Sequence, residues 1–262
     1  MENCTHITPI TQDITRIRVP FFDIFTTVFL VKTEKGNLLF DTATYDTDIT
    51  EIIFPALRSI GVSPDSLTHI FISHPHRDHA GGIPAILAAL PHVTVVAGSE
   101  ALREEYPDMH LQVAKEGDTL LDCLMTVSLP GHTPDAIALY DTRTKTLLSG
   151  DCLQLCGIYG SGDWGANITF PTAHLAALDR LALMDIAVIH PAHNYHPEGD
   201  VYTGKEGISR AISACREPLF LIRDMIKENP ALTDEELTAK YNQKGLPTLG
   251  ARVVTAVRRE LL

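Results

Sequence analysis

Four side chains with metal-binding chemistry fall within six residues of this chain, in the segment His74-Pro75-His76-Arg77-Asp78-His79. Imidazole and carboxylate groups are ligands for zinc and similar divalent metals. The apolar run 68–73 before the segment has the pattern of a buried strand, and residues 80–84 after it have the pattern of a tight turn into a helix. Because α/β folds place reactive groups in loops at strand ends, we predict that this segment is a metal-binding loop.

The same order of residues, an apolar run followed by Gly or Pro and a ligand-type side chain, occurs three more times downstream. The three segments contain His132, Asp151, and the pair His190 and His193. Each segment has the pattern of a buried strand that ends in a loop. We therefore expect these loops to converge with the metal-binding loop at one edge of a sandwich of sheets.

Taken together, these residues resemble the metallo-β-lactamase superfamily. The family motif His-x-His-x-Asp-His is present at 74–79, and the family's later ligands match a His in a Gly-His-Thr turn, an Asp after Gly, and a His in a Pro-x-His turn. The segment 38–42 is similar to the family's strand that ends in Asp, here Asp41, which supports the metal loop. The resemblance covers roughly residues 13–200 and implies an α+β fold, a four-layer αβ/βα sandwich of metallo-β-lactamase type.

The resemblance also implies two metal ions and a division of their ligands. The predicted ligands are His74, His76 and His132 for one metal, Asp78, His79 and His193 for the other, and Asp151 as the bridge between them. A hydroxide shared by two metals is a nucleophile at neutral pH, because metal-bound water is far more acidic than bulk water. Zinc is the expected metal and manganese or iron are alternatives, since His and carboxylate ligands suit several metals. Asp78 is also the predicted catalytic residue, as a carrier of protons.

Several residues next to these segments leave alternatives open. His190 is the rival of His193 for the last ligand position, although it ends an apolar run and fits a strand-end residue. Cys152 follows Asp151 and is an alternative ligand, whereas Asp151 could also be an ordinary turn residue after Gly150. Arg77 is either a solvated loop residue or a clamp for the substrate.

Other side chains near the predicted site have both a functional and a structural interpretation. Tyr195 and His196 lie just beyond the last predicted ligand and are candidate hydrogen-bond donors to a substrate. The Gly-rich loop 157–165, with Tyr159 and Trp164, is either a mobile pocket wall or an ordinary solvent loop. The histidines interpreted as surface or structural residues are His6, His69, His92, His110 and His174.

Composition narrows the class of protein. With 262 residues, 45% of them hydrophobic, the chain is long enough for one full-sized domain with a sizeable core. Its net charge of −12 disfavours a broad basic surface for nucleic acid, so a small-molecule substrate is expected. The five scattered cysteines form no disulfide framework, and we see no signal-peptide pattern or membrane-spanning apolar run. The expectation is a cytoplasmic protein without membrane or nucleic-acid partners, with a homodimer left open.

Hydrophobic periodicity predicts the elements that position the loops. Strands are predicted near 13–19, 25–32, 37–41, 68–73 and 93–97, followed by a second sheet built from 111–113, 124–129, 136–140 and 146–149, with a strand at 186–190 closing the core. Helices are predicted near 50–60, 83–90, from 99 onward and at 171–183. Residues 1–202 are the predicted hydrolase domain, and residues 203–262 are a helical appendage with helices at 209–227, after a capping box at Thr233, and at 251–262.

The branch of the resembled family guides the expected reaction. Flavodiiron proteins usually carry Glu where this chain has His76, and some true β-lactamases lack the Asp-His pair or the bridging Asp. Glyoxalase-II-like thioesterases and lactonases share the full pattern, although Asp135 replaces a Gly that often follows the Gly-His-Thr-Pro turn. The expected function is therefore a dinuclear hydrolase of a small carboxylic ester, lactone or thioester that uses a metal-bridging hydroxide. The alternatives are an iron-dependent oxidoreductase, a phosphodiesterase, and a metal-binding scaffold or sensor without turnover.

Overall fold

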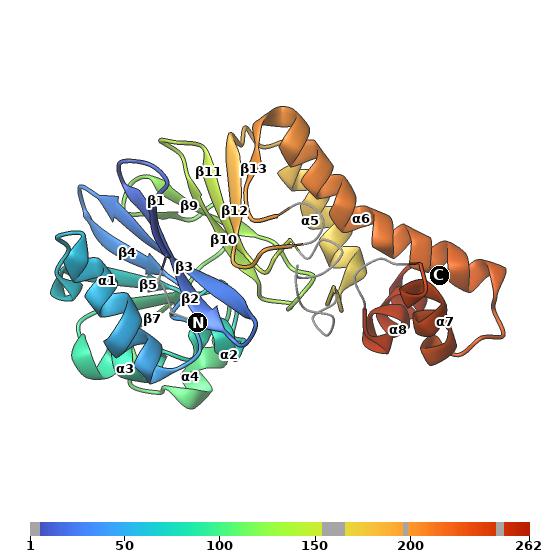
Figure 1. Ribbon diagram of the computed structural model, residues 1–262, viewed down its shortest axis with the longest axis horizontal. Helices are drawn as coiled ribbons and strands as arrows, with labels where there is room; N and C mark the ends of the chain where they lie inside the picture. The colour runs from blue at the N-terminus through green and yellow to red at the C-terminus, as the bar shows by residue number, and fades with distance from the viewer. Residues whose placement is uncertain (1–5, 154–165, 196–198, 245–248) are drawn as a thin grey trace. The chain divides into compact units, whose positions relative to one another are not determined.

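The computed structural model of the chain describes residues 6–153, 166–195, 199–244 and 249–262. It is a mixed α/β structure with two sheets and a helical C-terminal part (Figure 1), which confirms the predicted fold class. The chain divides into two compact units, one made of Met1–Ser128 with Ile137–Thr144 and the other of Leu129–Ala136 with Lys145–Leu262. The predicted domain limit at residues 202/203 stays a prediction.

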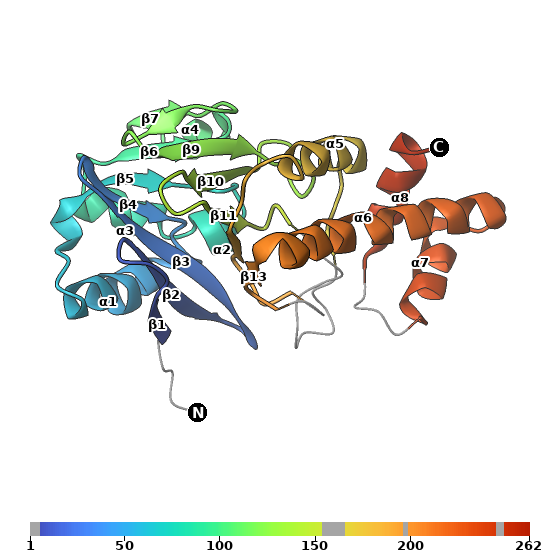
Figure 2. The same cartoon turned by 90° about the horizontal axis from the view of Figure 1, so that it is seen from above.

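The first unit contains a seven-stranded sheet in which the strands lie in the order of the sequence, as Figure 2 shows. The first four strands pair antiparallel, and the strands from the fourth to the seventh pair parallel. The strands are β1 (His6–Pro9), β2 (Ile14–Phe21), β3 (Ile24–Thr33), β4 (Gly36–Phe40), β5 (Leu67–Phe71), β6 (Thr94–Ala97) and β7 (Leu111–Val113).

Helical crossovers connect the parallel strands, because a strand can only be followed by a parallel neighbour if the chain returns to the same end of the sheet. The helices of this unit are η1 (Asp48–Ile53), α1 (Phe54–Ser59), η2 (Pro64–Ser66), α2 (Arg77–Ala80), α3 (Ile83–Ala89) and α4 (Ala101–Glu105). Buried residues of η1, α1, α3 and α4 pack with those of β2 to β6 in one hydrophobic core. This arrangement places the carboxyl ends of β4, β5 and β6 at one edge, where the metal-binding loop follows β5.

The structure corrects one prediction about this sheet. The strand at 111–113 was expected in the second sheet, but β7 pairs parallel with β6, with Val95 opposite Leu111. The reason is that α4 connects β6 to β7 and returns the chain for another parallel crossover. The helix expected near 50–60 is also divided, since its first turn is the π-helical segment η1 and α1 follows directly.

Three further strands of this unit form an antiparallel group. They are β8 (Thr119–Leu120), β9 (Leu124–Ser128) and β10 (Ile137–Asp141).

In its described residues the second unit has three strands and four helices. β11 and β12 pair parallel, and α5 lies between them in the sequence. β13 pairs antiparallel with β12. Helix α6 begins earlier than predicted, and α7 and α8 lie against its C-terminal half around a separate hydrophobic core (Figure 1). The elements are β11 (Thr146–Gly150), α5 (Pro171–Leu181), β12 (Val188–Pro191), β13 (Tyr202–Thr203), α6 (Gly204–Glu228), α7 (Asp234–Asn242) and α8 (Ala251–Glu260).

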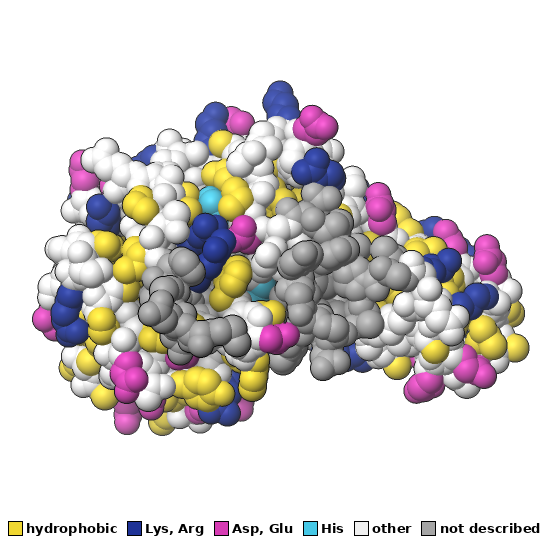
Figure 3. All heavy atoms as spheres, in the orientation of Figure 1, with side chains coloured by type: hydrophobic (Ala, Val, Ile, Leu, Met, Phe, Trp, Pro, Cys, Tyr) yellow, Lys and Arg dark blue, Asp and Glu magenta, His cyan; other side chains and the backbone are white. Residues whose placement is uncertain are grey.

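On the face drawn in Figure 3, Lys and Arg side chains are scattered among Asp and Glu side chains. Across the described part of the chain, each helix is too short or too polar to cross a bilayer.

The capping box predicted at the start of α7 is present and can be tested. Thr233 Oγ1 accepts a hydrogen bond from the Glu236 amide at 3.2 Å, and the Glu236 carboxylate accepts one from the Thr233 amide at 2.8 Å. We expect Thr233→Ala to lower the free energy of unfolding by about 1 kcal/mol, the usual cost of a lost helix cap. Thr238→Ala, inside the same helix, is the control. Urea unfolding measures both, and equal losses would show that the cap is not the source of the effect.

Candidate metal centre

The metal-binding loop begins where β5 ends and leads into α2. His76 precedes the helix, and Asp78 and His79 lie within its single turn. Ligand atoms of His74 and His76 lie within 4.8 Å of each other, and so do those of Asp78 and His79. The rings of His74 and His79 are 4.2 Å apart between centroids, and His79 Nε2 lies 3.4 Å from Asp78 Oδ2. The first unit therefore gathers four of the seven predicted ligands, with His74 and His79 buried.

Asp41, the residue after β4, fixes the orientation of His79. Its buried carboxylate accepts hydrogen bonds from the Ser73 amide at 2.8 Å, from Ser73 Oγ at 2.9 Å and from His79 Nδ1 at 2.7 Å. Burial raises the pKa of Asp41 above its usual value, and the bonds from His79 and Ser73 act in the opposite direction. Because Nδ1 of His79 is held by Asp41, Nε2 is the atom presented as a metal ligand.

Backbone contacts hold the loop after β4 against the metal-binding loop. The Thr42 amide and Thr42 Oγ1 both donate to the His79 carbonyl, at 2.7 Å and 2.9 Å. The Gly81 amide donates to the Ala43 carbonyl at 3.0 Å, and a Cβ at Gly81 would lie only 2.0 Å from the Thr44 carbonyl oxygen. Glycine is needed there because two backbone segments approach too closely for a side chain.

His132 is positioned in the second unit by the segment that precedes α5. Its Nδ1 lies 2.9 Å from the Asn167 carbonyl oxygen. A carbonyl oxygen only accepts, so Nδ1 donates and Nε2 is again the atom available to the predicted metal. Thr169 Oγ1 donates to the His132 carbonyl at 3.2 Å. Gly131, with φ +153°, makes the turn possible, since a Cβ there would lie 2.4 Å from Nδ1 of the buried His174.

Asp151 is the point at which the second unit's predicted ligands meet. Its Oδ1 lies 3.3 Å from His193 Nε2, and its Oδ2 lies 3.7 Å from His132 Nε2. All three side chains are buried. The Ala192 amide donates to the Gly150 carbonyl at 3.1 Å, which ties the His193 turn to the end of β11.

One residue near this group, Tyr195, differs in place from its predicted role. Tyr195 was a candidate donor to substrate, but its side chain is buried and its hydroxyl donates to Asp151 Oδ1 at 2.7 Å. His190, the rival ligand, is buried inside β12 opposite Leu148, as expected of a strand residue. Cys152 is buried and its amide donates to the Ser149 carbonyl.

Two of the other histidines that the structure describes have side-chain contacts of a structural kind. His69 Nδ1 lies 2.9 Å from Thr68 Oγ1, and His92 Nε2 lies 3.2 Å from the Leu67 carbonyl oxygen. Burial lowers the pKa of His69. Tyr159, Trp164, the loop 157–165 and His196 lie outside the described residues.

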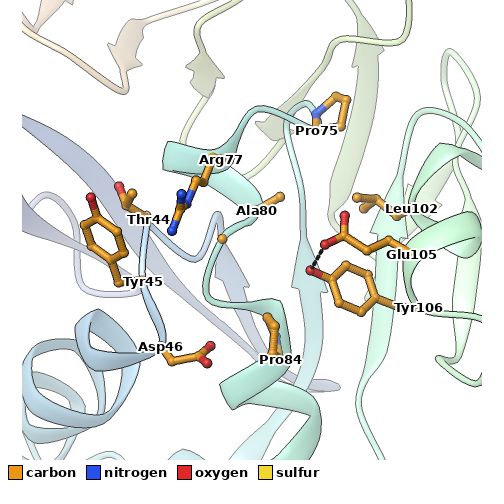
Figure 4. A pocket seen from close by; sticks show the side chains of 11 residues that line it. Thr44, Tyr45, Asp46, Pro75, Arg77, Ala80, Pro84, Leu102, Glu105 and Tyr106 are labelled. Atoms are coloured by element: carbon orange, nitrogen blue, oxygen red, sulfur yellow. Dashed lines mark hydrogen bonds between the residues drawn. The ribbon is translucent and has the colours of Figure 1, made fainter.

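Arg77 lines a cavity of about 590 Å³ beside the metal-binding loop (Figure 4). Its guanidinium lies 5.1 Å from the centre of the Tyr45 ring. Tyr106, also in the cavity wall, donates to Glu105 at 2.9 Å, and burial together with Glu105 and Asp46 raises its pKa to about 12. The carboxylates of Asp46 and Glu105 also line this cavity and would repel a simple anion. The role of Arg77 as a substrate clamp stays a prediction.

The donor chemistry of both units fits divalent metal ions. Every predicted ligand is an imidazole or a carboxylate, and Nδ1 of both His79 and His132 is engaged by a protein oxygen. Such outer contacts are the usual way in which proteins orient metal-binding histidines. The first unit offers His74, His76, Asp78 and His79, and the second offers His132, Asp151 and His193.

Comparisons with the sequences of known proteins point to one protein family. A family model described as "Metallo-beta-lactamase superfamily" matches residues 22–193. The "Beta-lactamase-like protein 2 homolog" of Caenorhabditis elegans is 28% identical over 256 residues, covering 91% of this chain and 80% of that protein. The "Probable hydroxyacylglutathione hydrolase glo2" of Schizosaccharomyces pombe is 30% identical over 172 residues, 64% of this chain and 63% of that protein.

Solved structures are similar in fold. A variant of the flavo di-iron protein of Thermotoga maritima matches with a TM-score of 0.64 and 19% identity, over 86% of this chain and 70% of that one. A metallo-β-lactamase from Pontibacter korlensis matches with a TM-score of 0.61 and 19% identity, over 81% of this chain and 99% of that one. At these identities the likeness concerns the fold alone.

The buried His174 beneath Gly131 predicts a pH dependence of stability. Burial is the main cause that lowers its pKa from 6.5 to about 4. Between these values the unfolded chain binds a proton that the folded chain does not, so stability is full above about pH 6.5 and is lost as the pH falls toward 4. We expect a contribution of about 2 kcal/mol to the loss between pH 7 and pH 4.5.

The measurement is the free energy of unfolding of the metal-free protein at both pH values, for the wild type and for His174→Gln. The fall should be smaller in His174→Gln by that amount. The same fall in both proteins would mean that His174 does not stay neutral in the folded state.

Proposed function

We propose, because this chain belongs to the metallo-β-lactamase superfamily, that it is a metal-dependent hydrolase of a small carboxylic ester, lactone or thioester. The superfamily consists mostly of metal-dependent hydrolases that bind two metal ions and act on small molecules. In this proposal the ligands of the two units combine as the sequence predicts, with His74, His76 and His132 on one metal and Asp78, His79 and His193 on the other. Asp151 bridges them, and zinc is the expected metal, with manganese or iron as alternatives.

The observation that carries the metal assignment is the engagement of Nδ1 in two of the predicted ligand histidines. His79 is oriented by the Asp41 carboxylate and His132 by the Asn167 carbonyl, so both present Nε2. With Nδ1 held by a protein oxygen in both residues, Nε2 is the ring nitrogen that can bind a metal. When bound, two metal ions would supply an acidified water and polarise the substrate carbonyl.

Several observations favour attack at an acyl carbon over attack at phosphorus. The fission yeast relative is by its name a hydrolase of an acylated glutathione, and this chain spans 63% of its length. Arg77 is the single basic side chain between His74 and His79, and the chain as a whole carries a net charge of −12. A phosphodiester would require more positive charge around its non-bridging oxygens.

Asp78 has a distinct role among the proposed ligands. Its carboxylate is partly exposed, whereas the neighbouring His79 is fully buried, and its Oδ2 lies 3.4 Å from His79 Nε2. A carboxylate that is both at the site and open to solvent can hold a metal with one oxygen and pass a proton with the other. We therefore propose Asp78 as the residue that carries the proton to the leaving group.

The substrate class is tested by kinetics at matched metal loading. Elemental analysis should first give close to two metals per chain. The loaded protein is then incubated with a thioester, a lactone, a carboxylic ester and a phosphodiester, and kcat/KM should be highest for one of the acyl substrates. A tenfold higher kcat/KM for the phosphodiester would contradict the acyl-hydrolase proposal.

The flavo di-iron likeness makes a second candidate explicit, an iron-dependent oxidoreductase. Such a protein would instead consume dioxygen when loaded with iron.

Asp78→Asn tests the proposed proton carrier. We expect turnover to fall by about a hundredfold or more, the scale of general acid–base effects. His92→Ala is the control, because His92 contacts only the Leu67 carbonyl among the partners given by the structure and lies outside the metal-binding loop. Turnover and thermal stability are measured for both variants. Equal losses of turnover would mean that the effect arises from folding.

A further inference from the structure

We infer that Tyr195 is a positioning residue that fixes the Asp151 carboxylate so that its two oxygens face two different predicted metal ligands. This inference rests on the proposed two-metal function, in which Asp151 is the bridge. It assigns Tyr195 to the carboxylate and not to the substrate.

The carboxylate of Asp151 is asymmetric in its surroundings. Oδ1 lies 3.3 Å from His193 Nε2, whereas Oδ2 lies 3.7 Å from His132 Nε2. In the proposed ligand division these histidines belong to different metals. Each oxygen therefore faces a histidine of a different proposed metal, an orientation in which one carboxylate would serve both metals.

That orientation needs an additional contact, because the terminal torsion of an Asp side chain is broad and nearly two-fold. Without a partner, the carboxylate would turn and no longer aim one oxygen at each histidine. The Tyr195 hydroxyl donates to Oδ1 at 2.7 Å, a short hydrogen bond to a carboxylate oxygen. It selects one orientation and leaves Oδ2 on the side of His132.

Tyr195 is itself held firmly enough to impose this orientation. Its side chain is 0% exposed, and its ring meets the His193 ring edge to face at 6.0 Å. Its amide donates to the Gly199 carbonyl at 2.9 Å, and its carbonyl accepts from the Gly199 amide at 2.6 Å. Both backbone polar groups of Tyr195, its amide and its carbonyl, are thus held by hydrogen bonds, and burial fixes the ring.

Tyr195→Phe removes only the hydroxyl and is the variant of choice. We expect zinc affinity, measured by competition with a chromophoric chelator, to fall by about 10–100-fold, the usual loss when an outer partner of a metal ligand is removed. We also expect a changed visible spectrum of the cobalt-substituted protein, which reports on ligand geometry. The melting temperature of the metal-free variant should stay close to that of the wild type.

Tyr241→Phe is the matched control, since Tyr241 is a second tyrosine of this unit with 1% exposure and it lies in α7, outside the predicted ligand segments. It should retain the zinc affinity and the cobalt spectrum of the wild type. A Tyr195→Phe protein with zinc affinity within about threefold of the wild type and an unchanged spectrum overturns the inference. If its KM rises at the same time, the hydroxyl contacts the substrate instead. These readouts do not depend on turnover, so a wild-type protein that binds two metals but hydrolyses no acyl substrate would contradict the proposed reaction and leave the Tyr195 result standing.

Discussion

The arrangement of the first unit's ligands depends on one buried carboxylate. Asp41 is fully buried, and a buried charge is tolerated only when it is paired and hydrogen-bonded. Its partners are the amide and hydroxyl of Ser73 and the ring of His79, which belong to the end of β5 and to α2. One side chain therefore joins the end of β4 to both ends of the metal-binding loop. Removing it would leave His79 without its orientation and Ser73 without its carboxylate partner.

The second unit reaches a similar result with different chemistry. Where His79 is held by a carboxylate, His132 is held by a backbone carbonyl, that of Asn167. A carboxylate partner makes an imidazole a stronger electron donor than a neutral carbonyl does. The two histidines are assigned to different metals in the proposed division, so the two metal positions are expected to differ in their chemistry even though both use imidazole nitrogens.

Much of this could be predicted from the sequence because the signals are local. The metal-binding loop lies within six residues, and the Thr233 capping box lies within four. The pairing of β7 with β6 was not predicted, because a three-residue strand carries no information about its neighbour. The contact between Tyr195 and Asp151 joins residues 44 positions apart in sequence, and a buried tyrosine has no periodic signal that names its partner. The side-chain contacts that orient the ligands were therefore not predicted. The ligands themselves were predicted from the sequence, and they stay a prediction.

The division of the predicted ligands between two units has a consequence for how the chain is made. A ribosome that adds 5–20 residues per second needs roughly ten seconds to extend the chain from His79 to His193, which lie 114 residues apart. Throughout that interval the nascent protein contains Asp41 and the whole metal-binding loop but lacks the last ligand. In the proposed ligand division, a metal captured during that interval would be held by the ligands of the first unit alone, because the order of synthesis sets the order in which the two ligand groups become available.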